Sequence, residues 1–285
     1  MVDLAYAKPE EREEVAQFMN RVFVRAKWDI DGWRGLVAGR WSGPDGRYAI
    51  TMRDQGEMVG VLGLVYAQRE TAQGIRTTAD MTSWYVLKDY RGQGMGQKMM
   101  KLATSDPAVT VTNFSSAKEA VRVLEKSGLV VLDKDRLVWH PSNASKLVVH
   151  DDPLALGDRL TVKDRKVIAD HQGLIRLRPV AVETPEGLCV MVVYPQKKHD
   201  DFVTHEIMYC GQQALFARYA GRIAASVLPE RDAILSLDRR FAAKGIEPDE
   251  VREFATPRFC QQGLLHPSEI DMLYSECVLL PIKIH

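Results

Sequence analysis

The sequence predicts an α+β fold in which a mixed central β-sheet is flanked by helices, with two such domains in tandem. Segments with alternating or β-branched apolar residues occur between segments with helical spacing of apolar residues, in both halves of the chain. The order of these segments in the first half is partly repeated in the second. A chain of 285 residues is also too long for one ordinary small domain and fits two moderate ones.

The first quarter of the chain predicts a short strand, a helix and a hairpin. Residues 6–24 place Pro9 near a helix start, with acidic residues in the first turn and apolar residues at helical spacing after it. Residues 47–70 alternate apolar and polar side chains around a turn at residues 54–57. This pattern predicts an antiparallel hairpin from about Tyr48 to Glu70.

The rest of the first half predicts strands that alternate with helices. Residues 78–90 are rich in β-branched and aromatic side chains and predict a strand, and residues 91–104 predict a loop that enters a helix. Residues 107–114 predict another strand. Residues 115–128 predict a helix with a serine N-cap and a glycine stop, and residues 129–140 predict a closing hairpin.

The second half predicts a similar order of elements. Residues 141–158 carry Pro, Ser, Asn, Asp and Gly without helical spacing, which is typical of a linker or a bridging strand. The elements predicted after it are a hairpin around 188–198, a strand and helix over 205–228, a strand at 233–238, a helix near 248–255 and a strand at 275–284. The expected domains are therefore residues 1–140 and 159–285, joined by residues 141–158.

The composition is that of a soluble globular protein. Apolar residues make up 46% and charged residues 27%, with 38 basic against 38 acidic side chains. A neutral total argues against broad nucleic-acid binding. No apolar stretch approaches the ~18 residues that span a bilayer, and the amino terminus lacks the basic region and apolar core of a signal peptide. We expect a cytoplasmic protein that has neither nucleic acid nor membrane as a partner.

Neither the cysteines nor the histidines have the spacing of a metal site. The cysteines are far apart and form no CxxC pair, so we expect reduced, buried thiols at Cys189, Cys210, Cys260 and Cys277. Residues 199–206 gather histidine and acidic side chains, but His199 and His205 lack the i, i+4 spacing of helical ligands. We expect a solvated loop there and no metal.

The segment YRGQGMGQ, residues 90–97, places three glycines between a predicted strand and a predicted helix. Such a turn exposes unpaired backbone N–H groups at the positive end of the helix, where an anion binds. The glycines allow a phosphate to approach the backbone closely. The spacing of Gly92, Gly94 and Gly96 is neither GxGxxG nor that of a P-loop. The segment is therefore interpreted as a pyrophosphate site of another kind.

In this context VLKDYRGQGMGQKMM, residues 86–100, resembles the acetyl-CoA signature of the GCN5-related N-acetyltransferases. The core of that signature is Arg or Gln, two residues, Gly, one residue, then Gly or Ala, and Arg91, Gly94 and Gly96 match it. The resemblance covers roughly residues 3–140. It implies an acyl-CoA N-acyltransferase fold with acetyl-CoA, or another acyl-CoA, as co-substrate. Gly211 alone stands at the corresponding place in the second half, so we expect a degenerate second domain without CoA.

The resemblance also implies how CoA binds. Backbone amides from Gln93 to Gln97 would hold the pyrophosphate, and the backbone of Trp84 and Val86 would pair with the pantetheine arm like an added strand. The residues implied to bind CoA are Trp84, Val86, Arg91, Gly92, Gln93, Gly94, Met95, Gly96 and Gln97.

The catalytic groups are less defined by the sequence. Acyl transfer to an amine needs a base, and often an acid that protonates the departing thiolate. In many family members the acid is a tyrosine at the position of Leu124. Either another group supplies this proton, or the domain binds CoA without turning it over. The candidate bases are Asp80 and Glu70, and the alternative is that both are solvated charges at strand ends.

The acceptor site is expected in the segment after the first helix. Trp28 and Trp33 lie there and are candidate substrate contacts, or else core residues that pack the segment onto the sheet. The function predicted is acyl transfer to the amine of a small molecule by direct attack, with the second half contributing to the acceptor site. The alternatives are a catalytically silent acyl-CoA-binding protein and a transferase that uses a longer acyl donor. The acceptor's identity, the acyl length and the oligomeric state do not follow from the sequence.

Overall fold

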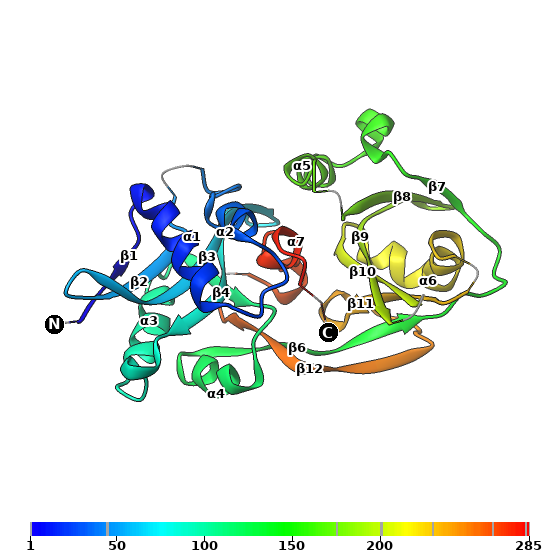
Figure 1. Cartoon of the computed structure of the whole chain (residues 1–285). Coiled ribbons are helices and arrows are strands. Elements are labelled where there is room, and N and C mark those ends of the chain that lie inside the picture. Colours follow the sequence, from blue (N-terminus) through cyan, green and yellow to red (C-terminus); the bar gives the residue numbers. More distant parts are fainter. Residues whose placement is uncertain are drawn as a thin grey trace. The chain divides into compact units, whose positions relative to one another are not determined.

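The computed structural model describes residues 2–43, 46–174, 176–199, 202–229, 231–263, 265–282 and 284 (Figure 1). The chain forms two compact units. Unit 1 contains Met1–Leu132, Thr256–Glu269 and Tyr274–Ile284, and unit 2 contains Asp133–Ala255 and Ile270–Leu273. None of the described helices is long and apolar enough to cross a lipid bilayer.

Unit 1 is a mixed sheet with strand order β1-β2-β3-β4-β5-β12. The first four strands pair antiparallel, β4 and β5 pair parallel, and β5 and β12 pair antiparallel. Its strands are β1 (Val2–Tyr6), β2 (Ala49–Asp54), β3 (Glu57–Thr71), β4 (Gly74–Val86), β5 (Val109–Asn113) and the end of β12 (Glu250–Gln261). Its helices are α1 (Arg12–Val22), α2 (Ile30–Val37), α3 (Met95–Ala103), α4 (Lys118–Lys126) and α7 (Glu276–Leu279).

Two apolar clusters cover the two faces of this sheet. Met81 of β4 packs with Met99 of α3 and Leu124 of α4 on one face. Trp33 of α2 packs with α1 and with Leu280 on the other face. Neighbouring side chains of a strand point to opposite faces, so the alternation in the strands supplies both clusters. The predicted fold, a mixed sheet flanked by helices, is confirmed.

Unit 2 has strand order β6-β11-β10-β9-β8-β7. Its strands are β6 (Leu129–Trp139, within unit 2 from Asp133), β7 (Val148–His150), β8 (Arg178–Thr184), β9 (Gly187–His199), β10 (Phe202–Cys210) and β11 (Ala233–Asp238). Its helices are α5 (Val162–Asp170) and α6 (Gln213–Val227). Antiparallel β9 and β10, then α6, then β11 parallel to β10, repeat the order and pairing of β3, β4, α3 and β5.

The structure divides the chain differently from the sequence-based expectation of residues 1–140 and 159–285. Most of residues 256–284 belongs to unit 1. The reason is that β12 pairs with β5 through Phe259 and Cys260, and that Leu280 then packs into the core of unit 1. Residues 141–158 belong to unit 2, where β7 pairs with β8.

Several predicted elements are corrected by long-range pairing. Residues 129–140 are one strand and no hairpin, since the polar side chains that suggested a turn are buried in ion pairs, such as Asp133 with Arg240. Residues 248–255 enter a strand where a helix was predicted, because β6 lies beside this part of β12 in the sheet. Residues 275–284 contain the short helix α7 where a strand was predicted. Its N-cap is Ser275, whose side chain accepts a hydrogen bond from the Cys277 amide.

Two local predictions are also corrected. The N-cap of α4 is Ala117 and no serine, so Ser115 and Ser116 precede the helix. His205 and Glu206 lie buried in β10, and the predicted solvated loop does not contain them. Asp200 and Asp201 lie outside the described residues. The four cysteines are free and buried, as predicted.

Candidate active site

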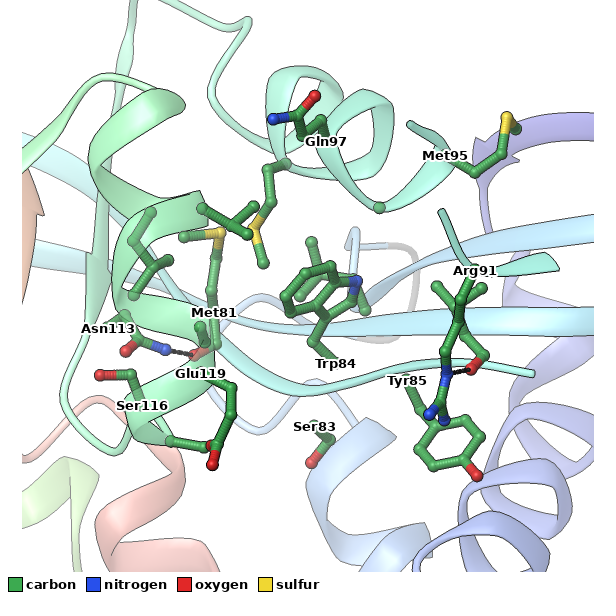
Figure 2. A pocket seen from close by; sticks show the side chains of 18 of the residues that line it. Met81, Ser83, Trp84, Tyr85, Arg91, Met95, Gln97, Asn113, Ser116 and Glu119 are labelled. Atoms are coloured by element: carbon green, nitrogen blue, oxygen red, sulfur yellow. Dashed lines mark hydrogen bonds between the residues drawn. The ribbon is translucent and has the colours of Figure 1, made fainter. Parts of the chain in front are cut away.

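A pocket of about 790 Å³ opens in unit 1 where β4 and β5 separate. The parallel pairing of these strands runs from Thr77 and Val109 to Asp80 and Thr112. Beyond that point the side chain of Asn113 donates a hydrogen bond from Nδ2 to the carbonyl of Met81, 2.7 Å away (Figure 2). A side chain thus takes the place of the next bond between the strands, and the strand ends line a cleft.

A β-bulge in β4 turns its last side chains into this cleft. The register of β3 and β4 shifts between Val61 and Gly63, opposite Ser83, whose φ of 49° is left-handed. The extra residue reverses the alternation of the strand. As a result Trp84 and Val86 lie on the same face as Met81, and Tyr85 lies on the other. Bulges of this kind often re-aim side chains next to active sites.

The glycine segment forms the turn that enters α3. Gly92 and Gly94 have φ of 78° and 72°, and Gly94 is the N-cap of α3. No side chain caps this end of the helix, and its first turn holds no acidic residue. The first amides of the helix therefore point at the pocket without a built-in anion, which is the arrangement that binds a phosphate.

The structure brings nearly all the predicted CoA contacts to this pocket. Of those residues, the ones that line it are Trp84, Val86, Arg91, Gly92, Gly94, Met95, Gly96 and Gln97. Gln93 does not line it, and its side chain donates a hydrogen bond to the carbonyl of Asp89. The Arg91 Nε donates to the carbonyl of Val86 at 2.7 Å, so this side chain fastens the turn to the end of β4.

Gly96 has a structural role that the signature alone does not reveal. The indole of Trp84 lies under the first turn of α3 (Figure 2), and a Cβ at Gly96 would overlap its ring. The Trp84 Nε1 is buried and has no hydrogen-bond partner in the structure. Glycine is thus required at this position by the packing of β4 against α3.

The two candidate bases lie in different places. Asp80 is 1% exposed, and its carboxylate accepts hydrogen bonds from the Thr112 hydroxyl at 3.0 Å and the Glu276 amide at 3.4 Å. Burial raises the pKa of Asp80 to about 7, against the lowering effect of these bonds and of Arg69. Glu70 pairs with Ile75 near the β3–β4 turn, roughly 16 Å along the strand from the level of Asp80. The structure does not bring Glu70 to the pocket.

Glu276 of α7 is a buried carboxyl group that sequence reasoning missed. It is 5% exposed, and the hydroxyl of Ser115, which lines the pocket, donates a hydrogen bond to it. Burial, and then the charge of Asp80, raise the pKa of Glu276 well above its ordinary value. The residue is 196 positions from Asp80, so no local pattern could have placed the two together.

The remaining predicted residues are also located. Trp33 is 1% exposed and packs in the core at 5.1 Å from the ring of Trp28, and neither tryptophan lines the pocket. Phe23, the residue directly after α1, lines the pocket. Leu124, at the position of the usual tyrosine acid, is buried and also lines it. The pocket therefore has an apolar group where many family members have a hydroxyl.

Comparison with known proteins agrees with this geometry. Residues 11–108 match the model of the Acetyltransferase (GNAT) family. This part of the chain is therefore similar to GNAT-family domains. The GNAT family uses acetyl-CoA as acyl donor, so the match supports an acyltransferase of the N-acetyltransferase type. A comparison with curated proteins finds no match to the sequence.

Solved structures show the same fold over most of the chain. A GCN5-related N-acetyltransferase from Anabaena variabilis superposes with a TM-score of 0.55 at 12% identity, over 91% of this chain and 72% of its own. A conserved protein of unknown function from Enterococcus faecalis gives a TM-score of 0.52 at 9% identity, over 91% of this chain and 72% of its own. Eis1 from Mycobacterium abscessus gives a TM-score of 0.50 at 12% identity, over 91% of this chain and 73% of its own. These matches extend across both units, which supports the tandem arrangement.

Proposed function

We propose that the protein transfers an acyl group, most simply acetyl, from acyl-CoA to a primary amine of a small molecule. The observation that carries this proposal is the pocket between the separated ends of β4 and β5, with the uncapped start of α3 at its edge. The family match supports the donor class, and the residues that line the pocket support the rest.

The donor fits the pocket in one direction. Its pyrophosphate would accept hydrogen bonds from the amides between Gly92 and Gln97, with the positive end of α3 behind them. The pantetheine arm would then run along Trp84 and Val86 into the cleft. There the Asn113 Oδ1 is buried and has no hydrogen-bond partner in the structure, so it offers an acceptor for an amide N–H of the arm.

The charges and rings around the cleft support this acceptor class. Among the described residues that line it, the charged side chains are Arg91 and Glu119, and Arg91 is engaged by the Val86 carbonyl. Glu119 is exposed in the first turn of α4 and attracts a cationic amine (Figure 2). Phe23 and Tyr85 offer apolar walls to its carbon skeleton. The neutral form of the amine would then attack the thioester directly.

A matched pair of glycine substitutions tests the donor site. Gly94→Trp places a bulky side chain in the turn, and Gly56→Trp places one in the β2–β3 turn of the same unit. Both glycines have positive φ and open space around the Cβ position, so both substitutions impose similar backbone strain. Acetyl-CoA at a hundredfold excess over Kd should stabilise the Gly56→Trp variant by about 2.7 kcal/mol, and the Gly94→Trp variant should gain nothing.

The measurement is thermal unfolding with free CoA, acetyl-CoA and a series of longer acyl-CoAs. The dependence on chain length identifies the donor. Equal stabilisation of both variants would place the donor site elsewhere, and no stabilisation of the wild-type protein by any acyl-CoA would contradict the proposal as a whole.

A second candidate, a silent acyl-CoA-binding protein, is favoured by the apolar Leu124 at the usual acid position. Release of free CoA separates the two candidates. A transferase releases CoA from acetyl-CoA only when a suitable amine is added, whereas a silent binding protein is stabilised by acetyl-CoA but releases no CoA with any amine. The amines to test are aliphatic diamines, amino sugars and arylalkylamines.

A further inference from the structure

A pair of buried carboxyl groups lies behind the wall of the pocket and has no role in the donor site. Asp80 projects from the face of β4 opposite Met81, and Glu276 of α7 lies beside it. The backbone amide of Glu276 donates a hydrogen bond to the Asp80 carboxylate. Their exposed fractions are 1% and 5%. Two neighbouring carboxylates that are buried from solvent repel each other when both are ionised. The pair therefore retains a proton more readily than isolated acids do.

The groups around this pair come from β3, β5, β12 and α7. Thr112 of β5 donates to Asp80, and the charge of Arg69 of β3 lowers the pKa of Asp80. Arg258 of β12 lies close enough to act on the neighbouring thiol of Cys277, whose pKa burial raises. The guanidinium of Arg69 favours a negative charge on Asp80, and burial disfavours a second negative charge in the pair.

Ser115 connects this buried pair to the pocket. Its hydroxyl donates a hydrogen bond to Glu276, while Ser115 itself is exposed and lines the cleft just before α4. The N-cap of α4 is Ala117 and no serine, so the Ser115 hydroxyl is available for Glu276. The neighbouring Ser116 has a buried hydroxyl without a hydrogen-bond partner and makes no such link.

We propose that Ser115, Glu276 and Asp80 form a proton relay that receives the proton of the attacking amine and returns it to the CoA thiolate. This inference rests on the proposed transferase function. The amine nitrogen forms a bond to the thioester carbon, and its proton passes to Ser115 as the hydroxyl proton of Ser115 passes to Glu276. When the C–S bond breaks, Ser115 donates its hydroxyl proton to the CoA sulfur, and Glu276 returns a proton to Ser115. One proton leaves nitrogen and one reaches sulfur, so the reaction balances.

The relay explains how the domain works with Leu124 at the position of the usual acid. A tyrosine there would give its proton to the thiolate, and Leu124 has none to give. The hydroxyl of Ser115 is the route by which the buried carboxyl pair reaches the same cleft. In this arrangement Ser115 contacts the reacting groups, whereas Glu276 and Asp80 act through it and tune its proton affinity.

Three variants test the relay, with CoA release from acetyl-CoA and the amines named above as the readout. Glu276→Gln keeps the shape of the side chain but accepts no proton, and Ser115→Ala breaks the link. Each should lower kcat by about 100-fold, within the range of acid–base catalysis, without changing the Kd of acetyl-CoA measured by calorimetry. Ser115→Thr retains the hydroxyl and should retain most of the activity. Ser105→Ala, at an exposed serine of unit 1 that does not line the pocket, is the control and should behave as the wild-type protein.

Two further readouts separate a relay from a structural role. The double variant Ser115→Ala with Glu276→Gln should be no slower than either single variant, because both substitutions break the same route. The pH profile is the second readout. The pair accepts a proton only after it has lost one, so wild-type kcat should rise with pH through the raised pKa of the pair, and this rise should disappear in Glu276→Gln.

The outcomes distinguish the two proposals. If the wild-type protein binds acetyl-CoA but releases CoA with none of the amines, the transferase function fails and the relay fails with it. If the wild-type protein is active and Glu276→Gln has the same kcat and pH profile, the relay alone is overturned. Losses that multiply in the double variant would also contradict a shared route.

Discussion

At the scale of single residues, the signature glycines serve two different physical needs. Gly94 adopts a positive φ as the N-cap of α3, with open space where a Cβ would stand. Gly96 has no such constraint, and the indole of Trp84 occupies the place of its Cβ. The sequence pattern treats these glycines alike. Only the structure shows that one permits a turn and the other permits contact between β4 and α3.

This difference predicts the effect of a single methyl group. Gly96→Ala should destabilise the protein by about 1–3 kcal/mol, because the added Cβ overpacks against Trp84. Trp84→Phe provides a smaller ring, so Gly96→Ala in that background should cost much less. Chemical denaturation of the four proteins measures the coupling. If the two substitutions had additive effects, the indole would not be the reason for the glycine.

At the scale of elements, local patterns predicted most of the first half correctly. The hairpin expected from Tyr48 to Glu70 corresponds to β2 and β3, and the strand, glycine loop and helix that follow are β4 and α3. These elements have periodic apolar residues and turn residues of their own. The bulge at Ser83 was not predicted, because it depends on the register between two strands and leaves no local pattern.

The missed elements are those that depend on distant partners. The segment 248–255 was interpreted as a helix, and it is a strand because β6 lies beside it in the sheet. The position of Glu276 behind Asp80 follows from the return of the chain into unit 1 at Tyr274. The glycine turn was thus predictable from nearby residues, whereas the buried carboxyl pair of the proposed catalytic site was not.

This return of the chain predicts that residues 1–140 alone do not fold as a stable domain. All five residues of β5 are buried, and without β12 the end of this strand becomes an exposed, unpaired edge. The fragment also lacks Leu280 from the core of unit 1. We expect the fragment to aggregate or lack a cooperative unfolding transition, with the full chain as control. A soluble fragment that unfolds cooperatively would show that β12 is dispensable.

At the scale of the whole molecule, the two units share an order of elements but differ at the turn that we propose binds the donor. In unit 2, β10 enters α6 at Gly211, and the carboxylate of Asp164 lies where a Cβ of that residue would stand. Tyr209 and Gln212 donate hydrogen bonds to this carboxylate, each at 2.7 Å. A fixed acidic group thus occupies the place that a pyrophosphate would need.

Consequently, one chain should bind one molecule of acetyl-CoA. A carboxylate held at the β10–α6 turn repels the phosphates that α3 attracts in unit 1, since like charges at short range are unfavourable in a partly dry site. Isothermal titration calorimetry of the wild-type protein and the Gly56→Trp control should give one site per chain, and Gly94→Trp should give none. A second site in the wild-type protein, or a remaining site in Gly94→Trp, would mean that unit 2 binds the donor despite Asp164.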